Sequence, residues 1–295
     1  MTAKLRSLSI IGCGKTGKTL GRLLASQRLF SIRDIVSSSK ESAELAVAFV
    51  GAGDVCCSVS ALRPADIFMV TTPDSKIVSV ARDLLASDLV GEGSVVFHCS
   101  GALGSELLAG LRGRGASVAS VHPVKSFSEP SQAVLSFTGT HCGIEGDERA
   151  VAELSRAFEA IGGRVFTVKA DAKPLYHAAH VFACNYLTAL IECAMQCSEQ
   201  AGINRAEALS IIAPLVRETT EAVLSRGPDA ALTGPVVRGD AAIVAEQSTQ
   251  ISQWRSDYGD LYRLLGQVAL DIASRSGALQ GESADLIKCA LAARA

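Results

Sequence analysis

The chain has 295 residues, 48% of them hydrophobic, which is enough for one large hydrophobic core or two of ordinary size. Its 28 basic and 30 acidic residues leave a formal net charge of −2 with no basic block, which argues against nucleic acid as a partner. A predicted strand begins within the first ten residues, so we expect no signal peptide, and the nine scattered cysteines are typical of reduced thiols in a cytoplasmic protein.

The first predicted element is a strand over residues 7–11 that runs directly into a glycine motif. Three glycines have the spacing G-x-G-x-x-G, and a helical pattern follows at once. The first glycine permits a tight turn, the second lets a diphosphate approach the backbone, and the third lets helix and strand pack closely. Free N–H groups at the start of the helix bind the anion. The motif predicts a dinucleotide site formed by Gly12, Cys13, Gly14, Lys15, Thr16 and Gly17.

The same residues also match the P-loop pattern G-x-x-x-x-G-K-[ST], which here ends in Lys18 and Thr19. In that interpretation Lys18 holds the β- and γ-phosphates and Thr19 binds Mg²⁺. The best later strand, however, runs into Thr-Thr-Pro before it reaches an Asp. The dinucleotide interpretation also explains Gly14 and Gly21, so we favour it over the P-loop and over a plain glycine turn.

Strands and helices alternate through the first half of the chain. Strands are predicted at 7–11, 32–36, 55–58, 66–71, 94–98, 116–121, 140–144 and 164–168, and helices at 16–27, 41–50, 76–87, 104–113 and 147–161. This alternation predicts an α/β domain over residues 1–169, with a doubly wound, mostly parallel sheet of the Rossmann type.

The residues after the second predicted strand bear on the choice of cofactor. An NAD site usually carries an Asp or Glu here for the ribose hydroxyls, whereas this chain has Ser37, Ser38, Ser39 and Lys40. A carboxylate would repel a 2′-phosphate, but hydroxyls and a cation would bind one, and Arg33 would help if its side chain leaves the strand outward. We therefore favour NADP over NAD, with a merely polar loop as the alternative.

Three polar loops follow consecutive strands, at 71–74, 98–102 and 122–127, and the carboxyl ends of parallel strands meet at one edge of a sheet. We expect the first two loops to line the cofactor through Thr71, Thr72, Pro73, Ser100 and Gly101. In the third loop His122 is the first candidate for a proton donor, because imidazole titrates near neutrality. A loop brace packed against Pro123 is an equally open role, and Lys125 could bind an anionic group or be solvated.

Helical patterns dominate after residue 170, at 172–201, 204–226, 240–253, 257–276 and 282–293. They predict an all-α domain over residues 170–295. The first helix is apolar on nearly every face, so we expect it to be buried. Asn185 and Glu192 interrupt its apolar run, which argues against a membrane span.

Polar side chains on this apolar helix form the second set of candidates. His177, His180 and Cys184 share one face, and Asn185 lies two turns after His177. A structural hydrogen-bond network, contact with substrate or nicotinamide, and a metal site are all open interpretations. No fourth metal ligand is evident, so we expect no metal.

The stretch 233–240 is the last informative motif. Gly234 and Pro235 predict a rigid turn, and Asp240 can cap the helix that follows. Arg238 could then reach a cleft between the two domains, although a surface Arg beside a capped helix is an open alternative.

Five motifs stand in order along the chain and together resemble a known family. They are Gly12–Gly17, Ser100-Gly101-Ala102, His122-Pro123-x-x-Ser126-Phe127, Tyr176-His177-Ala178-Ala179 with Asn185-Tyr186-Leu187, and Thr233-Gly234-Pro235-x-x-Arg238-Gly239-Asp240. The family comprises uncharacterised Rossmann-like proteins, provisionally classed as oxidoreductases, whose second half is a domain of unknown function. More distantly the chain resembles ketopantoate reductase, pyrroline-carboxylate reductase, hydroxyisobutyrate dehydrogenase and the deazaflavin-dependent NADP reductases.

The resemblance implies an NADP-linked two-electron reaction at a site between a Rossmann domain and a helical domain of the phosphogluconate-dehydrogenase type. It also implies a homodimer joined through the helices. The hydroxy-acid dehydrogenases of the wider group carry a Lys and an Asn one turn apart on the first helix of the second domain. Here Val181 stands four residues after His177, which leaves the substrate open.

These observations lead us to expect an oxidoreductase that transfers a hydride between NADP and a small, anionic carbonyl or imine compound. His122 or His177 would supply the proton, and Ser100, Asn185 and Arg238 would orient the substrate. The alternative is a non-catalytic NADP-binding sensor whose helical domain serves association.

Overall fold

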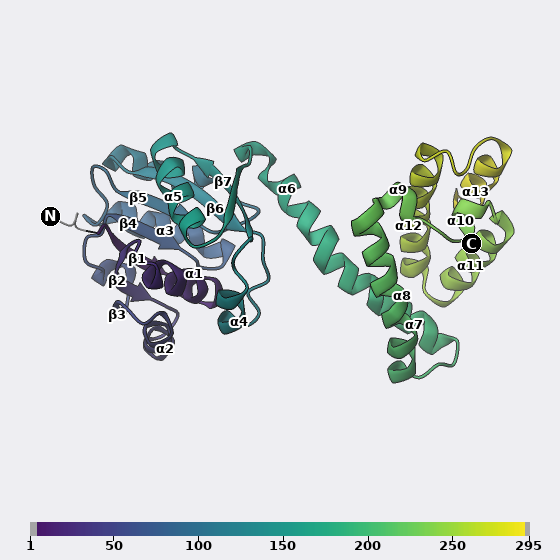
Figure 1. The fold of residues 1–295 in the computed structure, drawn as a ribbon, viewed down its shortest axis with the longest axis horizontal. Helices are drawn as coiled ribbons and strands as arrows, with labels where there is room; N and C mark the ends of the chain where they lie inside the picture. The colour runs from purple at the N-terminus through teal and green to yellow at the C-terminus, as the bar shows by residue number, and fades with distance from the viewer. Residues whose placement is uncertain (1–4, 293–295) are drawn as a thin grey trace. The chain divides into compact units, whose positions relative to one another are not determined.

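The computed structural model describes residues 5–292, and the chain divides into two compact units, Met1–Ala183 and Cys184–Ala295. The described strands all belong to the first unit (Figure 1). The predicted boundary at 169/170 falls just before the helix Lys173–His180, which the structure includes in the first unit.

One eight-stranded sheet forms the centre of the first unit, in the order β3-β2-β1-β4-β5-β6-β7-β8. Its strands are β1 (Ser7–Ile11), β2 (Ser31–Val36), β3 (Asp54–Cys56), β4 (Ile67–Val70), β5 (Val95–His98), β6 (Ser117–Pro123), β7 (His141–Gly146) and β8 (Arg164–Thr167). β7 is antiparallel to β6, and every other neighbouring pair is parallel. The predicted doubly wound, mostly parallel sheet is confirmed.

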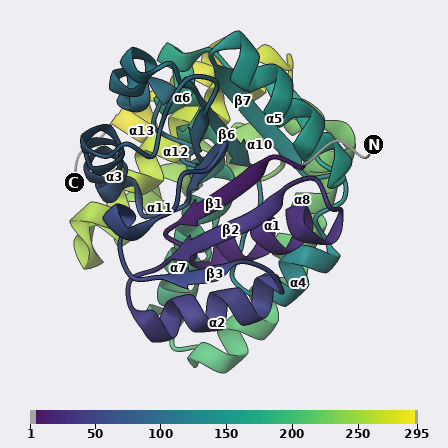
Figure 2. The ribbon, with the colours of Figure 1, turned by 90° about the vertical axis from the view of Figure 1, so that its left-hand side faces the viewer.

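Helices cover both faces of this sheet (Figure 2). They are α1 (Lys15–Ser26), α2 (Lys40–Val50), α3 (Asp74–Ala86), α4 (Pro130–Leu135), α5 (Glu148–Ala160) and α6 (Lys173–His180), with 3₁₀ turns η1 (Val59–Ala61), η2 (Ser105–Arg114) and η3 (Ala170–Ala172). The predicted α-helix at 104–113 is the 3₁₀ segment η2, because Gly110 and Gly113 inside it weaken α-helical propensity. The short elements η1 and α4 have no counterpart among the predicted elements.

The sequence of β4 is continuously apolar because the strand is buried on both faces of the sheet. All four of its residues are buried; Ile67 and Met69 belong to one hydrophobic cluster, and Phe68 and Val70 to another. Because successive side chains of a strand point to opposite faces, the two clusters are the two faces of the sheet. Side chains of α1, α2 and α5 complete the first cluster, and those of α3 and η2 complete the second.

The described part of the second unit is helical. Its elements are the end of a π-helical turn η4 (Val181–Tyr186), then α7 (Leu187–Gln200), α8 (Arg205–Arg226), α9 (Pro228–Ala231), α10 (Pro235–Arg238), α11 (Ala241–Trp254), α12 (Ser256–Arg275) and α13 (Glu282–Ala292). Residues of α11, α12 and α13 form a small core with Leu279. The two short helices not predicted from the sequence, α9 and α10, each begin with a proline, whose fixed φ suits the first helical turn.

The expectation that residues 172–201 are buried is wrong. Among these residues, all of which the structure describes, only Lys173 and Met195 are buried. Phe182, in the π-helical turn after α6, is 67% exposed. In the second unit α7 packs against α8. By length and composition alone, residues 170–200 form one helical stretch apolar enough to cross a membrane, a test that core helices of soluble proteins also pass.

Candidate functional site

The strand order of the sheet reverses between β1 and β4, and doubly wound sheets bind ligands at this point, outside the carboxyl ends of the strands. Gly12 follows β1 here, and Thr71 follows β4. The N–H groups of Gly12 and Cys13 donate to the Val36 carbonyl at 2.8 and 3.1 Å, and the Thr71 hydroxyl donates to the Gly12 carbonyl at 3.0 Å. Residues of three strand ends therefore fix the glycine turn at the switch in strand order.

Each glycine of the motif meets a different constraint. Gly12 has a φ of +81°, and a side chain there would overlap Thr72. A side chain at Gly17 would overlap the Thr71 hydroxyl. Apart from Gly14 and its two chain neighbours, no atom of the described residues lies within 4 Å of the place that a Cβ of Gly14 would take. Gly12 and Gly17 are thus required by the fold, whereas Gly14 leaves open space at the start of α1, where a diphosphate would approach.

The first turn of α1 is suited to an anion. Lys15 and Thr16 begin the helix, Gly14 is its N-cap, and no side chain of the described residues caps it by a hydrogen bond. Thr19 is fully buried, and its hydroxyl donates to the Lys15 carbonyl at 2.9 Å. A P-loop needs this hydroxyl on Mg²⁺, so the geometry argues against the P-loop interpretation.

Two buried groups flank the turn. Burial raises the pKa of Cys13 to about 12, so its thiol stays protonated. The Thr72 hydroxyl is buried and has no hydrogen-bond partner among the described residues, while Pro73 is the N-cap of α3. Since buried hydroxyls are normally paired, a bound ligand is a natural partner for Thr72.

The four polar residues after β2 divide into two pairs. The Ser37 hydroxyl hydrogen-bonds that of Ser42 at 2.9 Å, and the Ser39 hydroxyl caps α2 by accepting from the Ser42 N–H. Ser38 and Lys40 are exposed, and the Lys40 ammonium lies 3.8 Å from Glu44. Ser38 and Lys40 therefore remain the better candidates for contact with a ribose phosphate.

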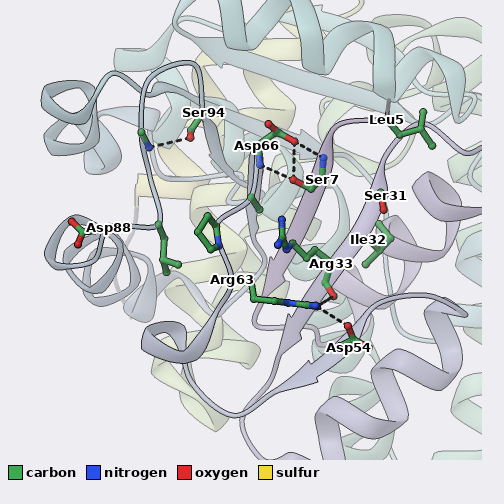
Figure 3. A pocket seen from close by; sticks show the side chains of 14 residues that line it. Leu5, Ser7, Ser31, Ile32, Arg33, Asp54, Arg63, Asp66, Asp88 and Ser94 are labelled. Atoms are coloured by element: carbon green, nitrogen blue, oxygen red, sulfur yellow. Dashed lines mark hydrogen bonds and ion pairs between the residues drawn. The ribbon is translucent and has the colours of Figure 1, made fainter. Parts of the chain in front are cut away.

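A hollow of about 690 Å³ lies at the opposite, amino edge of the sheet (Figure 3). Arg33 lines it together with Arg63 and Asp54, so the predicted help of Arg33 at the ribose is wrong. Asp34, the nearest acid to the ribose position, is buried and accepts hydrogen bonds from the Arg63 backbone and guanidinium. Its carboxylate is therefore not available to ribose hydroxyls.

His98, the last residue of β5, is held in one protonation state by its neighbours. His98 is fully buried; its Nδ1 accepts from the Ser100 N–H at 3.2 Å, and its Nε2 lies 3.1 Å from the Gly104 carbonyl. These contacts require a neutral ring with the proton on Nε2. Burial lowers the pKa of His98, in agreement with this geometry.

Acid is therefore expected to loosen the loop after β5. Because the folded protein disfavours the His98 imidazolium, the unfolded chain binds this proton first as the pH falls below about 6.5. As the pH is lowered, the free energy of unfolding should fall more steeply in the wild type than in His98→Gln. The difference between the two slopes should be up to about 1.4 kcal/mol per pH unit. Urea unfolding between pH 7 and 5 measures the two slopes.

The exposed His141 provides the control for this comparison, because His141→Gln should leave the wild-type slope unchanged. Equal slopes for the wild type and His98→Gln would show that His98 does not titrate differently in the folded and unfolded states.

Ser100 is occupied by structural contacts. Its hydroxyl donates to Asp74 at 2.9 Å and accepts from the N–H groups of Ala102 and Leu103, and its side chain is buried. Its carbonyl accepts from the Lys173 ammonium at 2.9 Å. The geometry suits a brace for the loop better than the predicted contact with substrate.

Lys173 connects this loop to the centre of the sheet. It is 1% exposed, donates to the Ser120 hydroxyl at 2.5 Å, and lies 3.9 Å from the Glu145 carboxylate. Glu145 in turn accepts from the N–H and hydroxyl of Ser105, both at 2.7 Å. Burial lowers the pKa of Lys173, an effect that the Glu145 charge opposes. One buried ion pair thus joins β6, β7, η2 and the start of α6.

Three histidines gather at the end of β6. Ring centroids of His122 lie 5.6 Å from His177 and 5.7 Å from His180, both on α6. His122 Nδ1 hydrogen-bonds the Tyr176 hydroxyl at 3.0 Å. The structure thus brings the two predicted proton-donor candidates, His122 and His177, into one cluster and adds His180 to it.

The electrostatics of the cluster alter the role expected of His122. Burial lowers its pKa to about 4, with smaller contributions from His177, His180 and Lys173. At neutral pH the ring is therefore uncharged and has no extra proton to give. The expectation that it titrates near neutrality is wrong, because the ring is buried beside other histidines and a lysine.

Two family models divide the chain between them. A Rossmann-like domain matches residues 1–123, and a domain of unknown function, DUF2520, matches residues 140–269. The chain is a Rossmann-like protein with a DUF2520 domain. No protein with a curated description matches it.

Solved structures share this fold over nearly the whole chain. Protein TM1727 from Thermotoga maritima is 26% identical, with a TM-score of 0.73 over 92% of this chain and 99% of that one. A protein from Bacteroides fragilis, provisionally described as an NADP oxidoreductase, is 21% identical with a TM-score of 0.71 over 91% and 98%. Pyrroline-5-carboxylate reductase from Coxiella burnetii is 15% identical with a TM-score of 0.56 over 94% and 100%.

The histidine cluster combines both matched segments. His122 lies in the Rossmann-like match, whereas His177 and His180 lie in the DUF2520 match. Sequence reasoning missed Lys173 and Glu145, which brace the loop after β5 that contains Ser100 and Gly101. A signal was present, because each is a charged residue beside an apolar run, where an unpaired charge would be costly.

The other predicted residues of the DUF2520 domain belong to the second unit. Asn185 is exposed within the π-helical turn η4, and Cys184 is an exposed free thiol. Arg238 donates to Asp240 at 2.8 Å. Asp240 is the N-cap residue of α11, but its carboxylate is engaged by Arg238 and makes no capping hydrogen bond. The predicted side-chain cap is therefore wrong. Lys125, in the first unit, donates to the Ser136 carbonyl.

Proposed function

We propose that this protein is an NAD(P)-dependent oxidoreductase that uses NADP. The observation that carries the proposal is the glycine turn at the switch in strand order, with open space at Gly14 and an uncapped start of α1. The solved structures of similar fold include proteins described as reductases, which supports the same class.

In the proposed reaction a hydride passes between the nicotinamide and the carbon of a small, anionic carbonyl or imine compound. Bound NADPH supplies the hydride. The histidine cluster of the protein polarises the acceptor oxygen or nitrogen of the substrate and delivers a proton to it. Since His122 is uncharged at neutral pH, we assign the proton to His177 or to a water molecule held by the cluster. Ser100 is proposed to brace the loop that follows β5.

The position of the cluster supports this assignment. β4, β5 and β6 run parallel to β1, so His122 and the loop containing Gly101 leave the sheet at the same edge as Gly12. In doubly wound folds this edge holds the cofactor. A sensor that binds NADP without turnover is the alternative.

Calorimetric titration of the full chain with NADPH, NADH and ATP–Mg²⁺ tests the proposal. We expect heat with NADPH and none with ATP–Mg²⁺, followed by NADPH oxidation with at least one member of a panel of oxo- and imino-acids. ATP–Mg²⁺ binding without nicotinamide binding would overturn the proposal, and tight NADPH binding without turnover would favour the sensor.

The NADP preference is tested by Ser38→Asp. A carboxylate at this exposed position should repel the 2′-phosphate and accept ribose hydroxyls, so the ratio of NADPH to NADH affinity should fall by about tenfold or more. The dissociation constants of both coenzymes measure it.

Ser79→Asp on the exposed side of α3 is the matched control, since it adds the same charge in the same unit. An unchanged ratio in Ser38→Asp, or tighter binding of NADH than NADPH by the wild type, would contradict the proposed 2′-phosphate site.

We also propose that the protein works in the cytoplasm as a homodimer joined through its helices. Large apolar side chains of α8 and α12 are exposed, among them Leu215, Leu224 and Leu264 at 59%, 80% and 67%. Exposed apolar surface of this kind is typical of an interface, and a second copy of the helical unit would cover it.

A further inference from the structure

We propose that His122, His177 and His180 form a binding site for a divalent metal ion of the zinc class. Each residue offers one ring nitrogen, and the three nitrogens lie within 4.8 Å of one another. A zinc ion bonds to imidazole nitrogen at about 2.0–2.1 Å, so shifts of about 1 Å in the rings would bring all three into its coordination shell.

The hydrogen bonds of the rings leave the right atoms for a metal. Tyr176 occupies Nδ1 of His122, and a proton there leaves Nε2 with a free lone pair. Nδ1 of His177 and Nδ1 of His180 are buried and have no hydrogen-bond partner among the described residues. Buried polar atoms are normally paired, so these two nitrogens call for a partner that the protein itself does not supply.

Gly101 marks the space between two of these nitrogens. A Cβ built on Gly101 would lie 2.5 Å from His177 Nδ1 and 2.8 Å from His122 Nε2. Both nitrogens therefore lie so close to the backbone of Gly101 that a side chain at residue 101 would displace them. The loop that positions Gly101 is the one braced by Lys173.

The surroundings allow a positive ion. The Lys173 ammonium acts electrostatically on His122. It is engaged by Ser100 and Ser120 and lies 3.9 Å from the Glu145 carboxylate. The Tyr176 hydroxyl holds the outer nitrogen of His122, which is the arrangement that orients histidine ligands in metal sites.

The donor set selects the metal. Three imidazoles without a carboxylate suit Zn²⁺ and its first-row neighbours, whereas Mg²⁺ and Ca²⁺ prefer oxygen ligands. Three protein ligands leave a fourth position open, as in catalytic zinc sites, and an ion there would polarise a carbonyl or imine. The inference deepens the proposed function and rests on it for the ion's role: because His177 becomes a ligand, the proton would come from the water molecule held by the cluster. Metal binding itself needs no dinucleotide.

The test is calorimetric titration of the chelator-treated full chain with Zn²⁺, in the absence of coenzyme. We expect one site in the wild type. Tyr176→Phe removes an outer-shell partner and should weaken Zn²⁺ binding by about 10–100-fold. His177→Gln and His180→Gln each remove a ligand and should weaken Zn²⁺ binding by more than that. Gly101→Ala should also weaken it, because the methyl group would displace His177 Nδ1 and His122 Nε2 from their positions.

Two controls make the result specific. His141→Gln removes the exposed histidine of β7 and should bind Zn²⁺ like the wild type. Titration with Co²⁺ should give the visible bands of a nitrogen-ligated tetrahedral ion without thiolate charge-transfer bands, which separates this site from the free cysteines.

The proposal fails if the wild type binds no Zn²⁺, or if His177→Gln and His180→Gln bind it as tightly as the wild type does. Far-ultraviolet circular dichroism shows whether each variant is folded. Because NADPH binding is measured separately, loss of this proposal leaves the proposed oxidoreductase function standing, and the converse also holds.

Discussion

Gly14→Ala is expected to weaken NADPH binding about 100-fold, equivalent to about 2.8 kcal/mol, while the protein stays folded. The protein has room for the new methyl group, because no atom of the described residues beyond its chain neighbours lies within 4 Å of it. The dinucleotide does not have room, because its diphosphate must approach the backbone at this residue. Calorimetric titration with NADPH measures the affinity, and thermal unfolding measures the stability.

Gly113→Ala is the matched control. Gly113 also has a negative φ and open space at its Cβ position, but it lies in η2 and not in the glycine turn. The Gly113→Ala variant should bind NADPH as the wild type does. If Gly14→Ala also keeps wild-type affinity, the diphosphate does not lie over the start of α1, and the proposed cofactor site is wrong.

Lys173→Met is expected to lower the free energy of unfolding by about 3–5 kcal/mol. Removing the ammonium leaves the Glu145 carboxylate buried without its opposite charge and deprives the Ser100 carbonyl of its donor. Urea unfolding measures the loss, and hydrogen exchange at residues 98–105 should show the loop opening first.

Two further variants separate the ion pair from simple loss of a lysine. Lys169→Met, at an exposed position a few residues earlier, should change the stability little. Adding Glu145→Gln to Lys173→Met should recover part of the loss, because the unpaired buried charge is then gone. A loss below about 1 kcal/mol in Lys173→Met would show that Lys173 is not a brace for the loop.

The sequence by itself determined the sheet and the glycine turn. Strands such as Ile67–Val70 are short apolar runs bounded by turn residues, and glycines at fixed spacing after β1 have few other structural uses. These are local patterns, in which backbone geometry and burial depend on neighbours in the chain. For the same reason the strands lie within two residues of their predicted bounds.

Only the tertiary structure decided the content of the histidine cluster. His122 lies more than fifty residues from His177 and His180, and the antiparallel pairing of β7 with β6 is part of what brings α6 back to His122. The same folding buries Lys173 against Glu145 and leaves the Ser100 hydroxyl fully engaged. A residue's partners and its pKa depend on which distant side chains share its surroundings, and the sequence pattern around one residue does not contain that information.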